Sequence, residues 1–195
     1  MFLLQEPSDA AAEEFIDSQR RRPFSYEEVG ASRVRAPAGY NVDHNRVRLG
    51  RGEEAFARAV AAVRAWEMFR LGWCRVHPAA APVEVGTTVA VVVRHYGFWS
   101  LNACRIVYLI EEQGALHRFG FAYGTLPEHG ESGEERFSVE WNREDDSVVW
   151  YDIYAFSRPH HPLAKAGYPL GRVMQRRFAR DSKAAMVRAV EGGGR

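Results

Sequence analysis

The sequence predicts an α+β fold in which a strongly curved antiparallel sheet wraps around a long C-terminal helix. The middle of the chain, from about residue 73 to residue 156, is a succession of runs with the two-residue periodicity of β-strands. From residue 170 onward, apolar residues recur at the three- and four-residue spacing of a helix. Several of the strands are apolar on both faces, so we expect one face to meet helices and the other a second layer or a ligand.

The N-terminal region predicts one helix and two short extended segments. Ser8 suits the N-cap of a helix over residues 8–22, which Pro23 ends. Residues 24–29 have the pattern of a short strand. Residues 43–49 are polar with alternating apolar positions only at the end, which indicates an edge strand or an extended loop.

The second helix is predicted after Gly50 and has about 17 residues in an amphipathic pattern. Its apolar stripe repeats at intervals of three and four residues and consists of Phe56, Ala59, Val60, Val63, Trp66 and Phe69. Gly72 suits the position that closes such a helix.

The strands that follow are predicted at residues 73–77, 83–93, 101–110 and 148–156, with two more on either side of the central segment 121–137. Consecutive strands with short connections form an antiparallel meander. In the run 101–110 the two-residue alternation predicts one shared face for Cys104, Ile106, Tyr108 and Ile110.

The connection inside segment 121–137 is predicted as a loop of roughly ten residues, longer than an ordinary hairpin turn. Its glycines and Pro127 exclude a helix. Long loops in compact proteins are often functional, so its polar residues are the first candidates for chemistry.

The last helix begins near Pro162 or Pro169, either of which can occupy a first turn. Its basic side chains are expected to cover a solvated surface. We expect a single domain over residues 1–195, with the N-terminal helix at about 8–22, the core at about 24–190 and a flexible tail at 191–195.

The amino-acid composition limits the kinds of binding partner and the cellular location that we expect. The chain has 26 Lys and Arg against 25 Asp and Glu, so bulk charge favours neither nucleic acid nor an anionic membrane. Cys74 and Cys104 lie in apolar runs without a Cys-x-x-Cys spacing, which is typical of reduced core thiols in a cytosolic protein. No signal peptide or membrane-spanning run is recognisable, so we expect a cytoplasmic protein of undetermined oligomeric state.

Four segments carry a resemblance to a known family: FAYGTLPEHGESGEERF at 121–137, RLGRGE at 48–53, CRIVY at 104–108 and AFSRP at 155–159. Over about residues 24–189 the chain resembles the family numbered 1990 among the domains of unknown function. That family is similar to the helix-grip proteins of the Bet v 1 and START-like superfamily. The resemblance implies the helix-grip fold, and the family offers no established activity or catalytic residue to carry over.

A helix-grip fold implies a cavity between sheet and helix, and our leading prediction is a site there for a small hydrophobic or amphipathic molecule. Its predicted ligand-binding residues are Tyr108, Phe121, Tyr123, Thr125, Trp141, Tyr151, Met174 and Phe178. The alternative is a filled core in which the same aromatic side chains pack on one another.

Two other classes of function stay open. In the first, the protein is an enzyme, a hydrolase, lyase or cyclase, in which His129 and Glu128 or Glu131 transfer protons. His-x-Glu without a third distant ligand does not make a metal site, so we predict neither a metal nor another cofactor. In the second, the basic last helix binds a protein partner through Arg176 and Arg180, which predicts no enclosed cavity.

Glu134 and Glu135 close the central segment and are predicted to have a structural role. Each can accept backbone N–H groups and anchor the loop, or pair with Arg48 or Arg105. Neither is counted among the candidate site residues.

Overall fold

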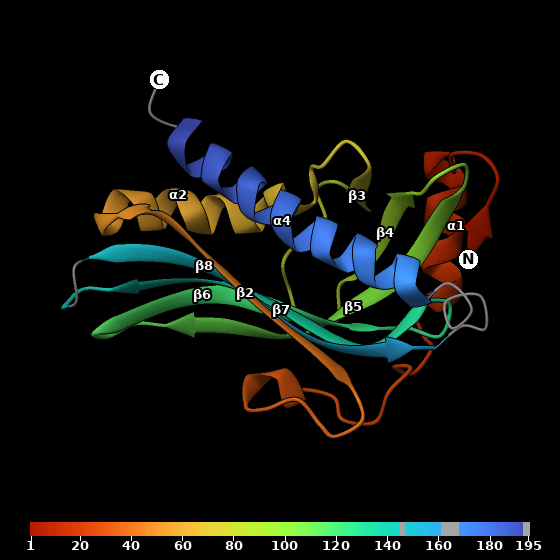
Figure 1. The fold of residues 1–195 in the computed structure, drawn as a ribbon, viewed down its shortest axis with the longest axis horizontal. Coiled ribbons are helices and arrows are strands. Elements are labelled where there is room, and N and C mark those ends of the chain that lie inside the picture. Colours follow the sequence, from red (N-terminus) through yellow and green to blue (C-terminus); the bar gives the residue numbers. More distant parts are fainter. Residues whose placement is uncertain (145–146, 161–167, 193–195) are drawn as a thin grey trace.

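The computed structural model describes residues 1–144, 147–160 and 168–192. Its elements follow one another as shown in Figure 1: β1 (Phe2–Leu3), α1 (Asp9–Gln19), the 3-10 helix η1 (Ala31–Arg33), β2 (Asn41–Arg51), α2 (Gly52–Arg64), the 3-10 helix η2 (Glu67–Phe69), β3 (Cys74–His77), β4 (Thr88–Arg94), β5 (Trp99–Glu112), β6 (Leu116–Thr125), β7 (Glu131–Asn142), β8 (Val148–Pro159) and α4 (Tyr168–Gly192).

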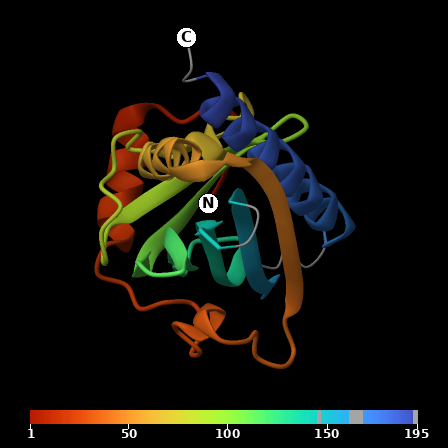
Figure 2. The ribbon, with the colours of Figure 1, turned by 90° about the vertical axis from the view of Figure 1, so that its left-hand side faces the viewer.

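The strands form one antiparallel sheet in the order β2-β8-β7-β6-β5-β4-β3, with β1 paired to β5. The sheet is curved, and α2 and α4 cover its concave face (Figures 1 and 2). Side chains from α2, α4 and the concave face form the main core, whereas α1 packs on the opposite face against β4 and β5 in a smaller core. The predicted curved antiparallel sheet around a long C-terminal helix is confirmed.

The long helix α4 is fixed across β2 and β8 by polar contacts as well as by its apolar stripe. Arg172 donates to both carboxylate oxygens of Asp43 on β2, at 2.6 and 2.8 Å. The hydroxyl of Ser182 lies 3.0 Å from that of Tyr151 on β8. Pro169 occupies the first turn, as predicted. The predicted start at Pro162, and the part of the predicted tail beyond residue 192, lie outside the described residues.

Two sequence-based predictions in the first part of the chain were wrong, one of a strand and one of a helix end. Residues 24–29 form no strand, because they cross the convex face as an irregular segment whose Tyr26 hydroxyl donates to Glu134 at 2.7 Å. The second helix ends at Arg64 rather than at Gly72. Trp66 turns the chain with a left-handed φ of 56°, held by its indole N–H bond to the carbonyl of Ala81, and the chain continues into η2.

The central connection is shorter than predicted. Strand pairing between β6 and β7 extends to Gly124 and Glu134, so that only residues 126–130 lie between the two strands. Glycines do not exclude strand structure where neighbouring backbones approach closely. Gly133 is such a position, because a Cβ there would lie 2.0 Å from the carbonyl oxygen of Phe156 on β8.

The predicted shared face on β5 is also wrong. The pairing of β5 with β6 shifts between Ile106 and Tyr108, as a β-bulge does. Ile106 therefore lies in the main core, whereas Tyr108 and Ile110 pack with Ala122 on the convex side. One extra residue in the strand reverses the face of every side chain that follows it.

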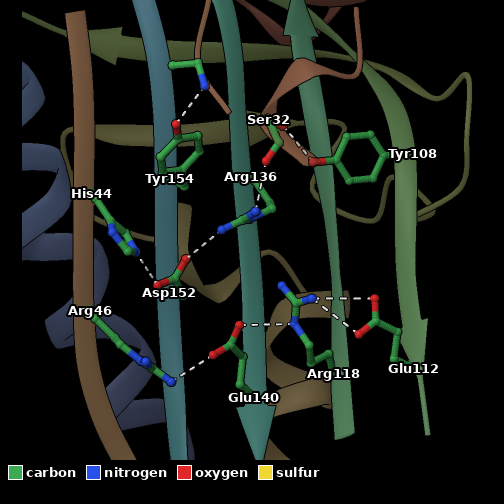
Figure 3. A network of polar contacts seen from close by, with 11 residues as sticks. Ser32, His44, Arg46, Tyr108, Glu112, Arg118, Arg136, Glu140, Asp152 and Tyr154 are labelled. Carbon is green, nitrogen blue, oxygen red and sulfur yellow. Dashed lines mark hydrogen bonds and ion pairs between the residues drawn. The ribbon is translucent and has the colours of Figure 1, made fainter. Parts of the chain in front are cut away.

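The convex face carries two rows of charged side chains across neighbouring strands (Figure 3). In the first row, Asp152 on β8 lies between His44 on β2, at 2.6 Å, and Arg136 on β7, at 3.2 Å. In the second row, Glu140 on β7 lies between Arg46 and Arg118, at 2.8 and 3.1 Å, and Arg118 continues to Glu112. Each carboxylate of these rows therefore has at least one cationic partner or partner imidazole.

Candidate functional site

A cavity of about 650 Å³ lies between the concave face of the sheet and the N-terminal half of α4. Much of its wall is apolar or aromatic and includes Phe69, Trp73, Val91, Val93, Met174 and Phe178. Its polar lining includes Asp43, Asn102, Thr125, His129, Glu131 and Glu135. Mostly apolar walls with a few polar groups are typical of small-molecule sites.

The aromatic wall is positioned by η2 and by the segment that leads into β3. Because α2 ends early, η2 carries Phe69 into the centre of the protein, where its ring lies 5.1 Å from Phe178 and 6.1 Å from Tyr123. Trp73 is held against α4, since its indole N–H donates to Asp181 at 3.0 Å and the guanidinium of Arg177 lies 4.3 Å from its ring.

Glu135 and Tyr123 form a polar pair in this wall. They are cross-strand neighbours on β7 and β6, and the Tyr123 hydroxyl donates to Glu135 Oε2 at 2.8 Å. Burial raises the pKa of Glu135 to about 7, against the opposing effect of the Tyr123 hydrogen bond. Burial also raises the pKa of Tyr123, so that the phenol keeps the proton it donates. Because Glu135 is half-buried and lines the cavity, its remaining surface belongs to the cavity wall.

His129 and Glu131 lie at the polar end of the cavity. The backbone N–H of Glu131 donates to His129 Nδ1 at 2.9 Å, so this nitrogen is the acceptor of a neutral ring and Nε2 carries the proton. Burial lowers the pKa of His129 to about 3 and raises the pKa of Glu131. A histidine with such a low pKa is a weak general base at neutral pH.

Glu128 lies outside this group. Its carboxylate is half exposed, and its backbone carbonyl accepts from the amine of Met1 at 2.9 Å. It is not part of the cavity lining. The structure therefore brings His129 and Glu131 together and separates Glu128 from the cavity.

The sequence pattern of one family, described as a domain of unknown function (DUF1990), matches residues 25–185. The chain belongs to the DUF1990 family. The resemblance noted in the sequence is thereby confirmed over nearly the range expected. A UPF0548 protein of Dictyostelium discoideum is 36% identical over 208 residues, covering 97% of this chain and 96% of the relative. A UPF0548 protein of Deinococcus radiodurans is 40% identical over 200 residues, covering 97% and 98%.

Among solved structures, a hypothetical protein of Helicobacter pylori is similar in fold, with a TM-score of 0.51 and 14% sequence identity, over 79% of this chain and 94% of that one. Together with the strand order and the C-terminal helix, this likeness supports the helix-grip fold for this member of DUF1990. No helix in residues 1–144, 147–160 or 168–192 is long and apolar enough to cross a membrane.

Four of the eight ligand-binding residues predicted for this DUF1990 chain line the cavity: Tyr123, Thr125, Met174 and Phe178. The other four lie elsewhere. Phe121 and Tyr151 are fully buried in the main core. Trp141 packs on Phe56 near α2, and Tyr108 lies on the convex face, where its hydroxyl meets that of Ser32 at 2.7 Å.

Glu135 is the cavity residue that sequence reasoning assigned to a structural role. Neither Arg48 nor Arg105 is an ion-pair partner of Glu134 or Glu135 among the residues with described positions, and Arg105 instead donates to three carbonyls at the end of α1. The sequence did contain a signal for this placement, because Glu135 is in phase with the buried Phe137 and Val139 on β7. It was overlooked because this part of β7 was interpreted as loop.

Both cysteines are buried and unbridged, as predicted. Cys74 lines the cavity, and burial raises the pKa of its thiol, so it stays neutral. Within the described parts of the chain, no group of three or more His, Cys, Asp and Glu side chains is arranged to hold a metal ion.

Proposed function

We propose that this protein binds a small amphipathic molecule in the cavity between the sheet and α4. The apolar part of the ligand packs against Phe69, Trp73 and Phe178, and its polar end meets the pair of Tyr123 and Glu135. The observation that carries the proposal is a cavity of about 650 Å³ whose apolar wall contains a carboxylate with a single side-chain hydrogen bond to the described residues. That volume falls in the range of small-molecule sites, roughly 300–1,000 Å³.

Proton transfer by His129 has less support. Its Nδ1 already accepts the backbone N–H of Glu131, and its low pKa leaves the ring neutral at physiological pH. Glu128, one of its two proposed partners, faces solvent. The geometry therefore favours binding over acid–base catalysis by this group.

A protein-binding role for the basic face of α4 also has less support. That hypothesis expects no enclosed cavity under the helix. Several of the cationic side chains already have partners within the chain: Arg172 binds Asp43, Arg177 lies over Trp73, and Lys183 donates to Asn45.

Filling the cavity tests the proposal. Met174→Trp places a large ring in the wall opposite the sheet, and we expect binding of the neutral probe tryptophol to weaken at least roughly ten-fold, as overpacking of a site does. Isothermal titration calorimetry measures the affinity. Native against denaturing mass spectrometry of freshly purified protein is expected to reveal a bound mass that denaturation removes.

The matched control is Val173→Trp, one residue earlier on the same helix, where the side chain is 50% exposed and outside the cavity lining. This variant is expected to bind tryptophol as the unmodified protein does. Equal affinity of all three proteins, or no binding by the unmodified protein, would contradict the proposal.

A further inference from the structure

The carboxylates that line the cavity differ in their cationic partners. Asp43 is paired with Arg172 through two hydrogen bonds. Arg172 and a hydrogen bond with Ser157 also oppose the rise in the pKa of Glu131. Glu135 has no ion pair within the part of the chain that the structure describes, and its hydrogen-bond partner is the neutral phenol of Tyr123. A carboxylate in apolar surroundings is costly unless charge or hydrogen bonds compensate it, so an unmatched carboxylate indicates where a complementary ligand group belongs.

Glu135 keeps hydrogen-bond capacity that the described part of the chain does not fill. Among the described residues its one side-chain hydrogen bond is the bond from Tyr123 to Oε2, which leaves Oε1 available to a ligand. A carboxylate can accept about four hydrogen bonds, so most of its capacity is unused. Nearby Asp43 adds negative charge to this region and raises the pKa of Glu135 further.

The wall around Glu135 also suits a positive charge. Aromatic rings carry a negative potential over their faces and attract ammonium and guanidinium groups within about 6 Å. The ring of Trp73 already has the guanidinium of Arg177 near it, at 4.3 Å. Phe69 and Phe178 also line the cavity, and the Cys74 thiol in its wall is neutral.

Cationic side chains do occur at the rim of the cavity, on α4. Arg176 and Arg180 are both exposed, and Arg180 pairs with Asp181 at 2.8 Å. Lys183 donates to Asn45 at 3.2 Å. Solvent and salt screen exposed charges strongly, whereas a partly buried carboxylate is screened much less. The exposed charges of Arg176 and Arg180 therefore act more weakly on a group bound in the cavity than the carboxylate of Glu135 does.

We propose that the cavity selects organic cations: an ammonium group donates to Glu135 Oε1, and an aromatic or alkyl body packs against Phe69 and Phe178 in the cavity wall. This inference rests on the proposed function and narrows it from amphipathic molecules in general to amphipathic amines. Neutral or anionic ligands of the same shape leave Glu135 without a partner and bind more weakly.

The test compares tryptamine with tryptophol, which share an indole and differ in the terminal amine or hydroxyl. Calorimetry is done at about pH 8, above the pKa of about 7 of Glu135 and below that of an alkyl ammonium, about 10. We expect tryptamine to bind at least roughly ten-fold more tightly, the order expected for one charge-assisted hydrogen bond.

Glu135→Gln keeps the shape of the side chain and removes its charge. We expect this variant to lose the preference for tryptamine, because the Gln amide oxygen still accepts a hydrogen bond from a hydroxyl but carries no charge that favours an ammonium. Circular dichroism reports whether the variant is folded. Glu128→Gln removes a carboxylate outside the cavity and is expected to keep the full preference.

The outcomes separate the two proposals. If the unmodified protein binds tryptophol as tightly as tryptamine, or if Glu135→Gln keeps the preference, the cation site is wrong and the amphipathic cavity stands. If neither probe binds to protein that circular dichroism reports as folded, the proposed function fails, and the cation site fails with it.

Discussion

Glu134 and Glu135 are adjacent on β7 and face opposite sides of the sheet, and they differ in how many hydrogen bonds the chain supplies to each carboxylate. Glu134 points to the convex side and is 2% exposed, and it accepts from the Tyr26 hydroxyl, from the backbone N–H groups of Gly30 and Ser32, and from the Ser32 hydroxyl. Glu135 lines the cavity, and its side chain accepts one hydrogen bond from the part of the chain that the structure describes. The chain fills the acceptor capacity of Glu134, which fixes the fold, whereas it leaves part of the capacity of Glu135 free for the ligand that we propose.

The convex face as a whole follows the pattern of Glu134. Asp152 is only 5% exposed at its side chain, yet it lies between His44 and Arg136 (Figure 3). Glu140 lies likewise between Arg46 and Arg118. These rows are internally compensated, so nothing in them calls for a ligand.

The largest expected effect on stability tests the comparison of Glu134 with Glu135 directly. Glu134→Gln replaces an acceptor by an amide N–H₂ that faces other donors, and we expect it to lower the free energy of unfolding by about 2–4 kcal/mol at neutral pH. Glu135→Gln is expected to raise it, because the charge that burial disfavours is removed. Urea denaturation measures both changes.

The two substitutions are chemically identical and lie one residue apart, so each controls for the other. Changes of the same sign and similar size would show that the two carboxylates do the same work, and would contradict the comparison.

Measuring the free energy of unfolding over a range of pH tests the effect of the Glu135 charge more specifically. The pKa of Glu135 is about 7 in the folded protein, against its ordinary value of 4.5, so between these values the folded chain holds a proton that the unfolded chain has released. The free energy of unfolding therefore falls as pH rises through this window, by about 1–3 kcal/mol, and is constant above it. Besides burial, Tyr123 and Asp43 act on the pKa of Glu135. Glu135 in turn contributes to the raised pKa values of Tyr151, Cys74 and Cys104.

The measurement is the difference in unfolding free energy between Glu135→Gln and the unmodified protein, which cancels other titrating groups. It is expected to be close to zero below about pH 4 and to reach a plateau above about pH 7. A difference that does not change with pH would contradict the raised pKa of Glu135.

The smallest effect is expected at the end of the convex rows. Glu112 is 55% exposed and contacts Arg118 at 3.3 Å, while Arg118 keeps its second partner Glu140. Glu112→Gln should change the free energy of unfolding by less than about 0.5 kcal/mol, as exposed ion pairs do. A loss above about 1 kcal/mol in thermal or urea denaturation would mean that the rows act as one cooperative network.

Much of the strand and helix pattern could be predicted from the sequence, because periodicity depends only on which residues are apolar. The meander from residue 73 to residue 156 and the stripe of α4 follow from it directly. The phase of β7, with Glu135 in step with Phe137 and Val139, also lay in the sequence, although the glycines beside it concealed the strand.

Tertiary contacts decided what periodicity leaves open. Where Tyr108 points depends on a bulge whose position is set by pairing with β6, and where α2 ends depends on the bond from Trp66 to Ala81. The different roles of Glu134 and Glu135 depend on the segment from Tyr26 to Ser32, which is about a hundred residues away along the chain and supplies donors to one carboxylate only. The sequence by itself determined the elements and their apolar faces. Only the tertiary structure decided which polar groups are satisfied, because hydrogen-bond partners come from residues that are distant in sequence.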